Sequence, residues 1–181
     1  MSVDVVFETH SISVDNERGI ATGWLPGRLS EQGRALAAEL GTRRREDDLA
    51  AVFTSDLRRA VETAEIAFAG SEIPVFEDSR LRECNYGELN GMPRERLEAE
   101  RSEHIDVPYP GGESWRQAVA RVEGLLDDLE RRWDGTRILV IGHVATRWAL
   151  EHRTNKVTLE QLVASPFEWQ PGWRYLLGTP S

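Results

Sequence analysis

Hydrophobic and polar positions along the chain follow two different periods. Short runs of apolar and β-branched residues predict buried strands at 3–7, 50–54 and 137–142, and weaker strands at 73–76 and 173–177. Apolar residues at helical spacing predict helices at 30–45, 55–68, 113–133 and 143–152. Strands that alternate with helices are typical of α/β proteins. We therefore expect a three-layer sandwich, with a mostly parallel central sheet and helices on both of its faces.

Polar residues indicate where several of these helices begin. Ser30 is expected to cap the first helix, Ser55-Asp56 to begin the second, and Ser114 to cap the longest. Thr158-Leu159-Glu160-Gln161 has the form of a capping box and predicts a further short helix. Gly41 is expected to weaken the end of the first helix. Turns are expected in the stretch between the first strand and the first helix, which is rich in turn residues.

The length of the chain and the breaks in its pattern indicate the domain organisation. A chain of 181 residues without internal repeats, low-complexity tracts or linkers suits a single domain spanning 1–181. Residues 81–91 are expected to form a loop, 93–104 a charged helix, and Pro108-Tyr109-Pro110-Gly111-Gly112 a break. We interpret the segment around 82–112 as a small lid insertion over the sheet.

Charge and composition exclude several classes of partner. The formal net charge is −9, with 31 acidic residues against 22 basic ones, so the chain should repel nucleic acid. No apolar stretch is long enough for a membrane helix, and the N-terminus lacks the pattern of a secretory signal. Cys84 is the single cysteine, which fits a reducing cytoplasm. We predict a cytoplasmic protein without nucleic-acid or membrane partners, and leave a homodimer open.

Two histidines and an arginine follow three different predicted strands. His10 comes after the strand at 3–7, His143 directly after the strand at 137–142, and Arg59 shortly after the strand at 50–54. Ligands of open α/β sheets bind beyond the carboxyl ends of the strands, so these side chains should share one crevice. Neutral imidazole is a good nucleophile toward phosphorus near neutral pH, and arginine stabilises the charge on the phosphoryl oxygens. The combination favours phosphoryl transfer.

Simpler roles for the same residues stay open. A histidine after a strand is often a surface or capping residue, and Asn16 could be an ordinary turn residue. Glu83 could be a solvated carboxylate paired with Arg82. Other phosphate chemistries fit less well, because Asn90 stands six residues after Cys84, where a cysteine phosphatase has arginine, and no Gly-x-x-x-x-Gly-Lys segment occurs. The four histidines lack the spacing of a zinc site, so no metal is expected.

Five short segments, in order along the chain, form a recognisable pattern. They are Asn16 six residues after His10, with Thr22-Gly23-Trp24 behind it; Ser55-Asp56-Leu57-Arg58-Arg59-Ala60; Leu81-Arg82-Glu83 with Tyr86-Gly87 behind it; Pro110-Gly111-Gly112-Glu113-Ser114; and Ile141-Gly142-His143. Together these segments resemble the histidine phosphatase superfamily, the phosphoglycerate mutase-like group, over most of the chain. The resemblance implies a phosphoglycerate mutase-like fold and an enzyme that forms a phosphohistidine intermediate without a metal or a cofactor.

The resemblance also implies a role for each matching residue. His10 would attack phosphorus, while Arg59, His143 and Asn16 hold the phosphoryl oxygens. Glu83 would protonate the departing oxygen and then help a water molecule attack the phosphohistidine. Contacts with the substrate are implied for Ser11, Asn16, Thr22, Gly23 and Val144. The partner implied by this site is a small phosphorylated molecule.

Three positions depart from the family's usual pattern. Thr9 stands where an arginine normally precedes the nucleophile, Val144 where a glycine follows the second histidine, and Trp148 where an arginine is common. Loss of one guanidinium should weaken phosphate binding and slow the chemistry. The candidates to replace it are Arg18, Arg28 and Arg147.

The function expected first is hydrolysis of a small phosphorylated metabolite by a metal-independent phosphomonoesterase. The segment from Glu83 to Gly112 is short compared with that of mutases, and a small lid favours water as the phosphoryl acceptor. Two alternatives remain. One is a phosphoglycerate-type mutase, and the other is a catalytically impaired domain that binds a phosphorylated ligand, because Thr9 replaces the usual arginine.

Overall fold

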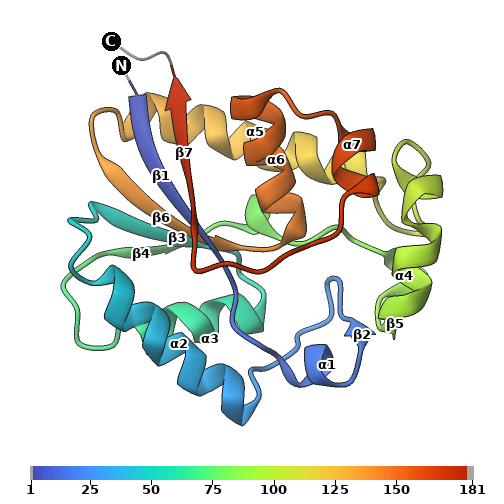
Figure 1. Ribbon diagram of the computed structural model, residues 1–181, viewed down its shortest axis with the longest axis horizontal. Helices are drawn as coiled ribbons and strands as arrows, with labels where there is room; N and C mark the ends of the chain where they lie inside the picture. Colours follow the sequence, from blue (N-terminus) through green and yellow to red (C-terminus); the bar gives the residue numbers. More distant parts are fainter. Residues whose placement is uncertain (1, 179–181) are drawn as a thin grey trace.

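The computed structural model describes residues 2–178, and a five-stranded sheet forms its centre. The strands are β1 (Ser2–Thr9), β3 (Ala51–Thr54), β4 (Val75–Glu77), β6 (Arg137–Gly142) and β7 (Trp173–Gly178). Their order across the sheet is β4-β3-β6-β1-β7; the first four run parallel, and β7 is antiparallel to β1 (Figure 1). The predicted mostly parallel sheet is confirmed.

Helices cover both faces of this sheet, as Figure 1 shows. Helices α2 (Glu31–Arg44) and α3 (Arg58–Ala67) pack together on one face. Helices α5 (Trp115–Arg132) and α6 (Val144–Asn155) pack together on the other face, with α7 (Leu159–Ala164) next to α6. The three-layer α/β sandwich predicted from the sequence is therefore confirmed.

A hydrophobic core lies on each face of the sheet, between the sheet and the helices that cover that face. Successive side chains of a strand point to opposite faces, so a strand buried on both faces is apolar throughout. In β1, Val5 and Phe7 join the core beneath α5 and α6, whereas Val6 joins the core beneath α2 and α3. In β6, Val140 and Ile141 divide between the two cores in the same way. The uninterrupted apolar runs of the sequence thus place β1 and β6 at the centre.

Three of the predicted helix starts are confirmed, and one is wrong. The side chains of Ser30, Ser114 and Thr158 accept hydrogen bonds from backbone N–H groups in the first turns of α2, α5 and α7. Helix α3 does not begin at Ser55-Asp56, because its N-cap is Leu57. The hydroxyl of Ser55 lies 2.7 Å from the ring of His143 instead.

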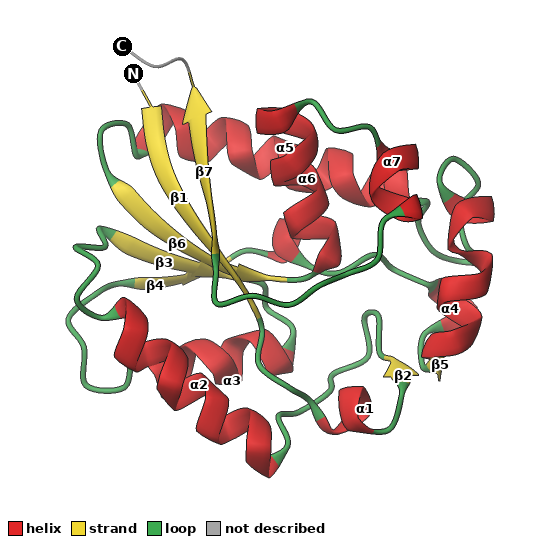
Figure 2. Ribbon diagram, in the orientation of Figure 1, coloured by secondary structure: helices red, strands yellow, loops and turns green. Residues whose placement is uncertain are grey.

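Several short elements were not predicted because they are too short to show a periodic pattern. Helix α1 (Val14–Glu17) and strand β2 (Ile20–Ala21) lie in the stretch for which turns were expected. Strand β2 pairs antiparallel with β5 (Met92–Pro93), which precedes α4 (Arg94–Glu100). The 3-10 helices are η1 (Ser79–Leu81), η2 (Gly87–Leu89) and η3 (Arg101–His104). Figure 2 shows β2, β5, α1 and α4 grouped at one side of the sheet, so the segment predicted as a lid is tied to the loop after His10.

Two glycines allow α2 to approach its neighbours closely. A Cβ atom at Gly41 would lie 2.2 Å from the carbonyl oxygen of Ala67, so this glycine permits close packing of α2 against α3. The helix continues through Gly41 to Arg44, and the weakening of its end by Gly41 stays a prediction. A Cβ atom at Gly33 would lie 1.8 Å from the carbonyl oxygen of Ile12, which places the start of α2 directly against the loop after His10.

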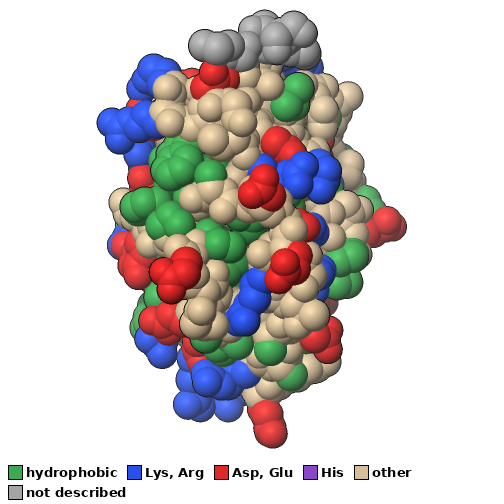
Figure 3. All heavy atoms as spheres, turned by 90° about the vertical axis from the view of Figure 1, so that its left-hand side faces the viewer, with side chains coloured by type: hydrophobic (Ala, Val, Ile, Leu, Met, Phe, Trp, Pro, Cys, Tyr) green, Lys and Arg blue, Asp and Glu red, His purple; other side chains and the backbone are tan. Residues whose placement is uncertain are grey.

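The edge strand β4 carries exposed hydrophobic side chains. Val75 and Phe76 are 42% and 44% exposed, and the Phe76 ring packs on Phe53 and Trp133. Figure 3 views the side of the molecule that lies at the left of Figure 1, where a cluster of hydrophobic side chains is surrounded by interspersed acidic and basic ones. The negative net charge therefore does not form a continuous acidic surface on this face. No helix within residues 2–178 is both long and apolar enough to cross a membrane.

Candidate active site

His10 lies directly beyond the end of β1, with its backbone N–H donating to the carbonyl of Gly142 on β6 (2.9 Å). Its Nδ1 atom is 2.7 Å from the carbonyl oxygen of Ser11. A carbonyl oxygen only accepts hydrogen bonds, so Nδ1 carries the proton and Nε2 keeps a free lone pair. Burial and the positive charge of Arg59 lower the pKa of His10 to about 3. The ring is therefore neutral near pH 7 and suited to act as a nucleophile.

His143 follows β6 and is 2% exposed. Its ring centroid lies 5.0 Å from that of His10, and its Nε2 atom is 2.7 Å from the hydroxyl oxygen of Ser55. That oxygen also accepts the backbone N–H of Leu57 (3.4 Å), and the Ser55 hydroxyl can either donate to Nε2 or accept a proton from it. In the tautomer in which Ser55 donates, Nδ1 carries the ring proton, and this nitrogen is buried without a hydrogen-bond partner. Burial, followed by the charge of Arg59, holds the pKa of His143 well below its usual value.

Arg59 is the second residue of α3 and is only 3% exposed. Its guanidinium donates to the carbonyl oxygens of Gly23 (2.9 Å) and Leu25 (3.4 Å), which belong to the loop between β2 and α2. Burial lowers its pKa, but an arginine remains charged at any physiological pH. The charge of Arg59 lowers the pKa of both histidines, so its guanidinium would also stabilise an anion held near the two rings.

Glu83 brings a carboxylate to the N-terminus of α6 and is 9% exposed. One oxygen accepts the N–H groups of Cys84 (2.9 Å) and Ala145 (3.1 Å), and the other accepts the N–H of Val144 (3.2 Å). These backbone donors hold the Glu83 side chain beside His143, at the N-terminus of α6. The alternative pairing with Arg82 is wrong, because Arg82 binds the carboxylate of Asp56 at 2.6–2.7 Å. The hydrogen bonds from Arg82 lower the pKa of Asp56.

The residues predicted to contact the substrate shape the loop after His10. The hydroxyl of Ser11 donates to the carbonyl of Gly33 (2.5 Å), and that of Thr22 donates to Asp15 (2.8 Å). The side chain of Asn16 accepts the N–H of Ser13 and completes the capping box of α1. Gly23, at φ +59°, offers its carbonyl to Arg59. These contacts give each residue a structural role, while its contact with a substrate stays a prediction.

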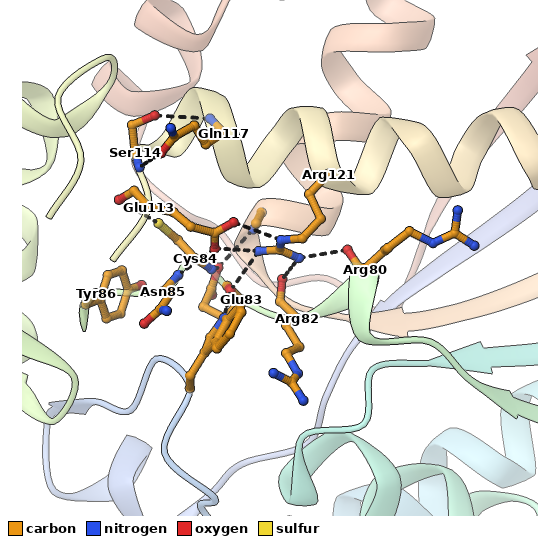
Figure 4. A network of polar contacts seen from close by, with 12 residues as sticks. Arg80, Arg82, Glu83, Cys84, Asn85, Tyr86, Glu113, Ser114, Gln117 and Arg121 are labelled. Atoms are coloured by element: carbon orange, nitrogen blue, oxygen red, sulfur yellow. Dashed lines mark hydrogen bonds and ion pairs between the residues drawn. The ribbon is translucent and has the colours of Figure 1, made fainter. Parts of the chain in front are cut away.

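Three neighbours of the site were not assigned from the sequence. Ser55 binds His143, although its position before α3 indicated a helix cap. Tyr86 is 2% exposed, and burial together with the charge of Glu83 raises its pKa. Arg121 of α5 donates to the backbone around Glu83, as Figure 4 shows. The sequence carries no signal for Arg121, since its partners lie about forty positions away along the chain.

Comparison with known families identifies the group to which this site belongs. Residues 8–168 match the model of the histidine phosphatase superfamily (branch 1). The chain belongs to this superfamily. The family resemblance stated from the sequence motifs is therefore confirmed, and His10, Arg59, Glu83 and His143 all lie within the matched region.

Individual members of the histidine phosphatase superfamily resemble the chain over most of its length. The 2,3-bisphosphoglycerate-dependent phosphoglycerate mutase of Parvibaculum lavamentivorans is 31% identical over 175 residues, which cover 88% of this chain and 83% of that protein. Among solved structures, Bacillus stearothermophilus YhfR has a TM-score of 0.84 at 25% identity, covering 98% of this chain and 92% of its own. A mycobacterial glucosyl-3-phosphoglycerate phosphatase has a TM-score of 0.76 at 25% identity, covering 89% and 83%. The phosphoglycerate mutase-like fold is thus confirmed.

Three arginines were candidates to replace the one that is missing at Thr9, and they lie in different parts of the structure. Arg18 and Arg28 are exposed on the loops that surround α1. Arg147 lies over the ring of Trp173, at 4.9 Å from its centroid, with a terminal nitrogen 3.8 Å from Glu151. Arg59 is the arginine whose charge acts on His10. Within residues 2–178, no group of three or more His, Cys, Asp or Glu side chains could hold a metal ion.

Proposed function

We propose that this chain is a phosphomonoesterase that hydrolyses a small phosphorylated metabolite through a phosphohistidine at His10. One observation carries the proposal. The neutral His10 ring has a free Nε2 lone pair and lies 5.0 Å from the ring of His143, with Arg59 beside both. A nucleophile next to a preorganised cation and an unpartnered ring N–H fits a phosphoryl group and its developing negative charge.

The first step transfers the phosphoryl group to the enzyme. The His10 Nε2 lone pair forms a bond to phosphorus while the bond from phosphorus to the ester oxygen breaks. Arg59 and the Nδ1–H of His143 stabilise the charge on the equatorial oxygens. The carboxyl group of Glu83 gives its proton to the departing oxygen, which leaves as an alcohol.

The second step returns the enzyme to its starting state. The Glu83 carboxylate accepts a proton from a water molecule, the water oxygen forms a bond to phosphorus, and the phosphorus–nitrogen bond breaks. Inorganic phosphate leaves, His10 is neutral again, and Glu83 is again protonated for the next cycle. Arg59 and the imidazole of His143 supply the charge stabilisation in this scheme, so the proposed reaction needs no metal.

A phosphoglycerate-type mutase is the second candidate, and it is favoured by the resemblance to the phosphoglycerate mutase of Parvibaculum lavamentivorans. The function of the mycobacterial structural neighbour, a phosphatase, favours hydrolysis. The difference lies in the acceptor, because a mutase returns the phosphoryl group to a bound hydroxyl and excludes water. The short segment between Glu83 and Gly112 supports water as the acceptor in this chain.

Product analysis tests the proposal directly. The wild-type protein is incubated in EDTA with p-nitrophenyl phosphate, a panel of phosphorylated metabolites, and 3-phosphoglycerate with 2,3-bisphosphoglycerate. The proposal predicts release of inorganic phosphate by the wild type and none by His10→Ala. Isomerisation of phosphoglycerate without net hydrolysis would establish the mutase instead. Vanadate binding without any turnover would leave a domain that only binds a phosphorylated ligand.

A further inference from the structure

Arg121, on α5, uses every donor of its guanidinium on one short stretch of backbone and one carboxylate. One terminal nitrogen donates to the carbonyl oxygens of Arg80 (2.8 Å) and Arg82 (3.0 Å). The other donates to the carbonyl of Glu83 (3.2 Å) and to Glu113 (2.8 Å), and Nε donates to Glu113 (2.9 Å). A guanidinium has five N–H groups, and all five have acceptors here.

Glu113 extends this arrangement to the other side of Glu83. Its carboxylate binds Arg121 and also accepts the backbone N–H of Asn85 (3.0 Å), while its own N–H donates to the carbonyl of Asn85 (2.8 Å). The backbone on both sides of Glu83 is therefore fixed to the N-terminal end of α5. Figure 4 shows Arg121 and Glu113 converging on the chain between Arg80 and Tyr86.

Trp24 connects the same point to the loop after His10. Its indole N–H donates to the carbonyl oxygen of Glu83 (2.7 Å), which thus has two donors. The guanidinium groups of Arg82 and Arg121 lie 4.6 Å and 5.7 Å from the centre of the Trp24 ring, within the range of cation–π attraction. The backbone of Glu83 is held from one side by α5 and from the other by the loop that leads to α2.

From these contacts we infer that Arg121 is a positioning residue for Glu83. All five of its donors are occupied, so none is left for a substrate; it fixes the backbone from which the Glu83 carboxyl group reaches the N-terminus of α6 and the leaving oxygen. This inference rests on the proposed function. The side chain of Arg121 is 18% exposed, and such a fork holds its acceptors in a geometry that lysine cannot reproduce.

The expected signature of this role is a loss of general acid catalysis with little loss of substrate binding. Hydrolysis of glycerol 2-phosphate releases a poor leaving group that needs the proton of Glu83, whereas p-nitrophenolate leaves with little help. We therefore expect Arg121→Met to lower kcat/KM for glycerol 2-phosphate roughly 10- to 100-fold, part of the ~10²–10⁴-fold that a general acid supplies. With p-nitrophenyl phosphate, kcat/KM should change by no more than about threefold, because Arg59 and His143 keep their places.

Two further variants distinguish the positioning role of Arg121 from the effect of its positive charge. Arg121→Lys keeps the positive charge but loses the fork, so it should show the same selective loss. In a Glu83→Gln background, Arg121→Met should have no further effect on glycerol 2-phosphate, because Arg121 acts through Glu83. Arg116→Met is the matched control: Arg116 lies on the same helix and pairs with Asp106 and Glu160 at the surface. In Arg116→Met, the ratio of kcat/KM for glycerol 2-phosphate to kcat/KM for p-nitrophenyl phosphate should equal that of the wild type.

Equal losses on both substrates, or an Arg121→Met effect that persists in the Glu83→Gln background, would overturn the inference. Thermal melting and vanadate binding check that each variant folds with an intact phosphate site. If Arg121→Met does not fold, the test is made with Arg121→Lys and Glu113→Gln. A wild-type ratio of kcat/KM for glycerol 2-phosphate to kcat/KM for p-nitrophenyl phosphate in both variants would also overturn the inference. A wild type without phosphatase activity would instead defeat the proposed function. A selective loss in Glu83→Gln without one in the Arg121 variants would defeat only this inference.

Discussion

The ring centroids of His10 and His143 lie 5.0 Å apart, and the rings are inclined by 48°. At this separation both imidazoles can contact one phosphoryl group, His10 through its Nε2 lone pair and His143 through its Nδ1–H. The other ring nitrogens are engaged elsewhere: Nδ1 of His10 donates to the carbonyl oxygen of Ser11, and Nε2 of His143 pairs with the hydroxyl of Ser55. In the proposed reaction, the same residue type therefore serves as nucleophile at one position and as donor at the other.

Replacing Arg59 should remove the main positive charge of the phosphate site. We expect Arg59→Met to lower kcat/KM roughly 10²–10³-fold, the loss typical of one preorganised donor. The neighbouring Arg58 has a side chain that is 57% exposed, so Arg58→Met should retain wild-type activity. Steady-state kinetics on p-nitrophenyl phosphate compare the two variants. An Arg59→Met enzyme within a few-fold of the wild type would place the phosphate elsewhere.

The neutral histidines should make the fold less stable in acid. The unfolded chain binds a proton at each histidine below about pH 6.5, whereas the folded chain keeps His10 neutral down to a pKa of about 3. Since the unfolded state then binds more protons, the free energy of unfolding falls as the pH falls, by ~1.4 kcal/mol per pH unit for each such group. His143, whose pKa is also lowered, adds to this slope.

Urea unfolding between pH 7 and pH 4 measures this effect. His10→Asn should reduce the slope of unfolding free energy against pH by about 1.4 kcal/mol per unit below pH 6. His143→Asn should do the same. Slopes that match the wild type in both variants would mean that the two rings gain their protons in the folded state.

The closest packing around the site occurs at Gly33. A methyl group there would overlap the carbonyl of Ile12 at 1.8 Å, so Gly33→Ala must displace either α2 or the loop after His10. We expect a loss of stability of about 2 kcal/mol or more and a fall in activity, as for other overpacked positions. Gly124, on α5, has nothing within 4 Å of the added methyl group, so Gly124→Ala should stabilise the protein by ~0.5–1 kcal/mol. Thermal melting of both variants gives the comparison.

The buried carboxylate of Glu8, two residues before His10, should contribute to the stability of the fold and not to catalysis. Glu8 is 1% exposed and binds both Arg43 and Arg44 of α2 at 2.9–3.0 Å. Glu8→Gln leaves the two guanidinium groups without their counter-charge. Because both arginines reach solvent, we expect a loss of about 3 kcal/mol, the low end for breaking a buried pair.

The exposed pair Arg96–Glu100 provides the control for this substitution. Glu100→Gln removes a surface contact between neighbouring helical turns and should cost no more than ~0.5 kcal/mol. Chemical denaturation of both variants measures the difference. Equal effects from Glu8→Gln and Glu100→Gln would show that the buried pair does not stabilise the fold.

Most of the fold could be predicted from local patterns. The apolar runs of β1 and β6 fixed their central positions, and Ser30, Ser114 and Thr158 marked three helix starts. The convergence of His10 and His143 also followed from their places after parallel strands. What local patterns could not supply were contacts between distant parts of the chain. Glu83 and Ala145 are 62 positions apart.

The same limit explains the wrong start of α3 and the unpredicted small sheet. Ser55 looked like a helix cap because its neighbours in sequence suggested one, but its hydroxyl is taken by His143, 88 positions away. Strands β2 and β5 have two residues each and exist only because they pair with one another. No periodicity can reveal an element of that length.

The most direct test of the account is to trap the phosphoryl group on the enzyme. The protein is mixed with a substrate carrying labelled phosphorus, quenched in alkali within milliseconds, digested, and its peptides are analysed by mass spectrometry. The account predicts an acid-labile, alkali-stable phosphate on the peptide that contains His10, absent from His10→Ala and lost on a chase with unlabelled substrate. Turnover without label on His10, or with label on His143, would contradict it.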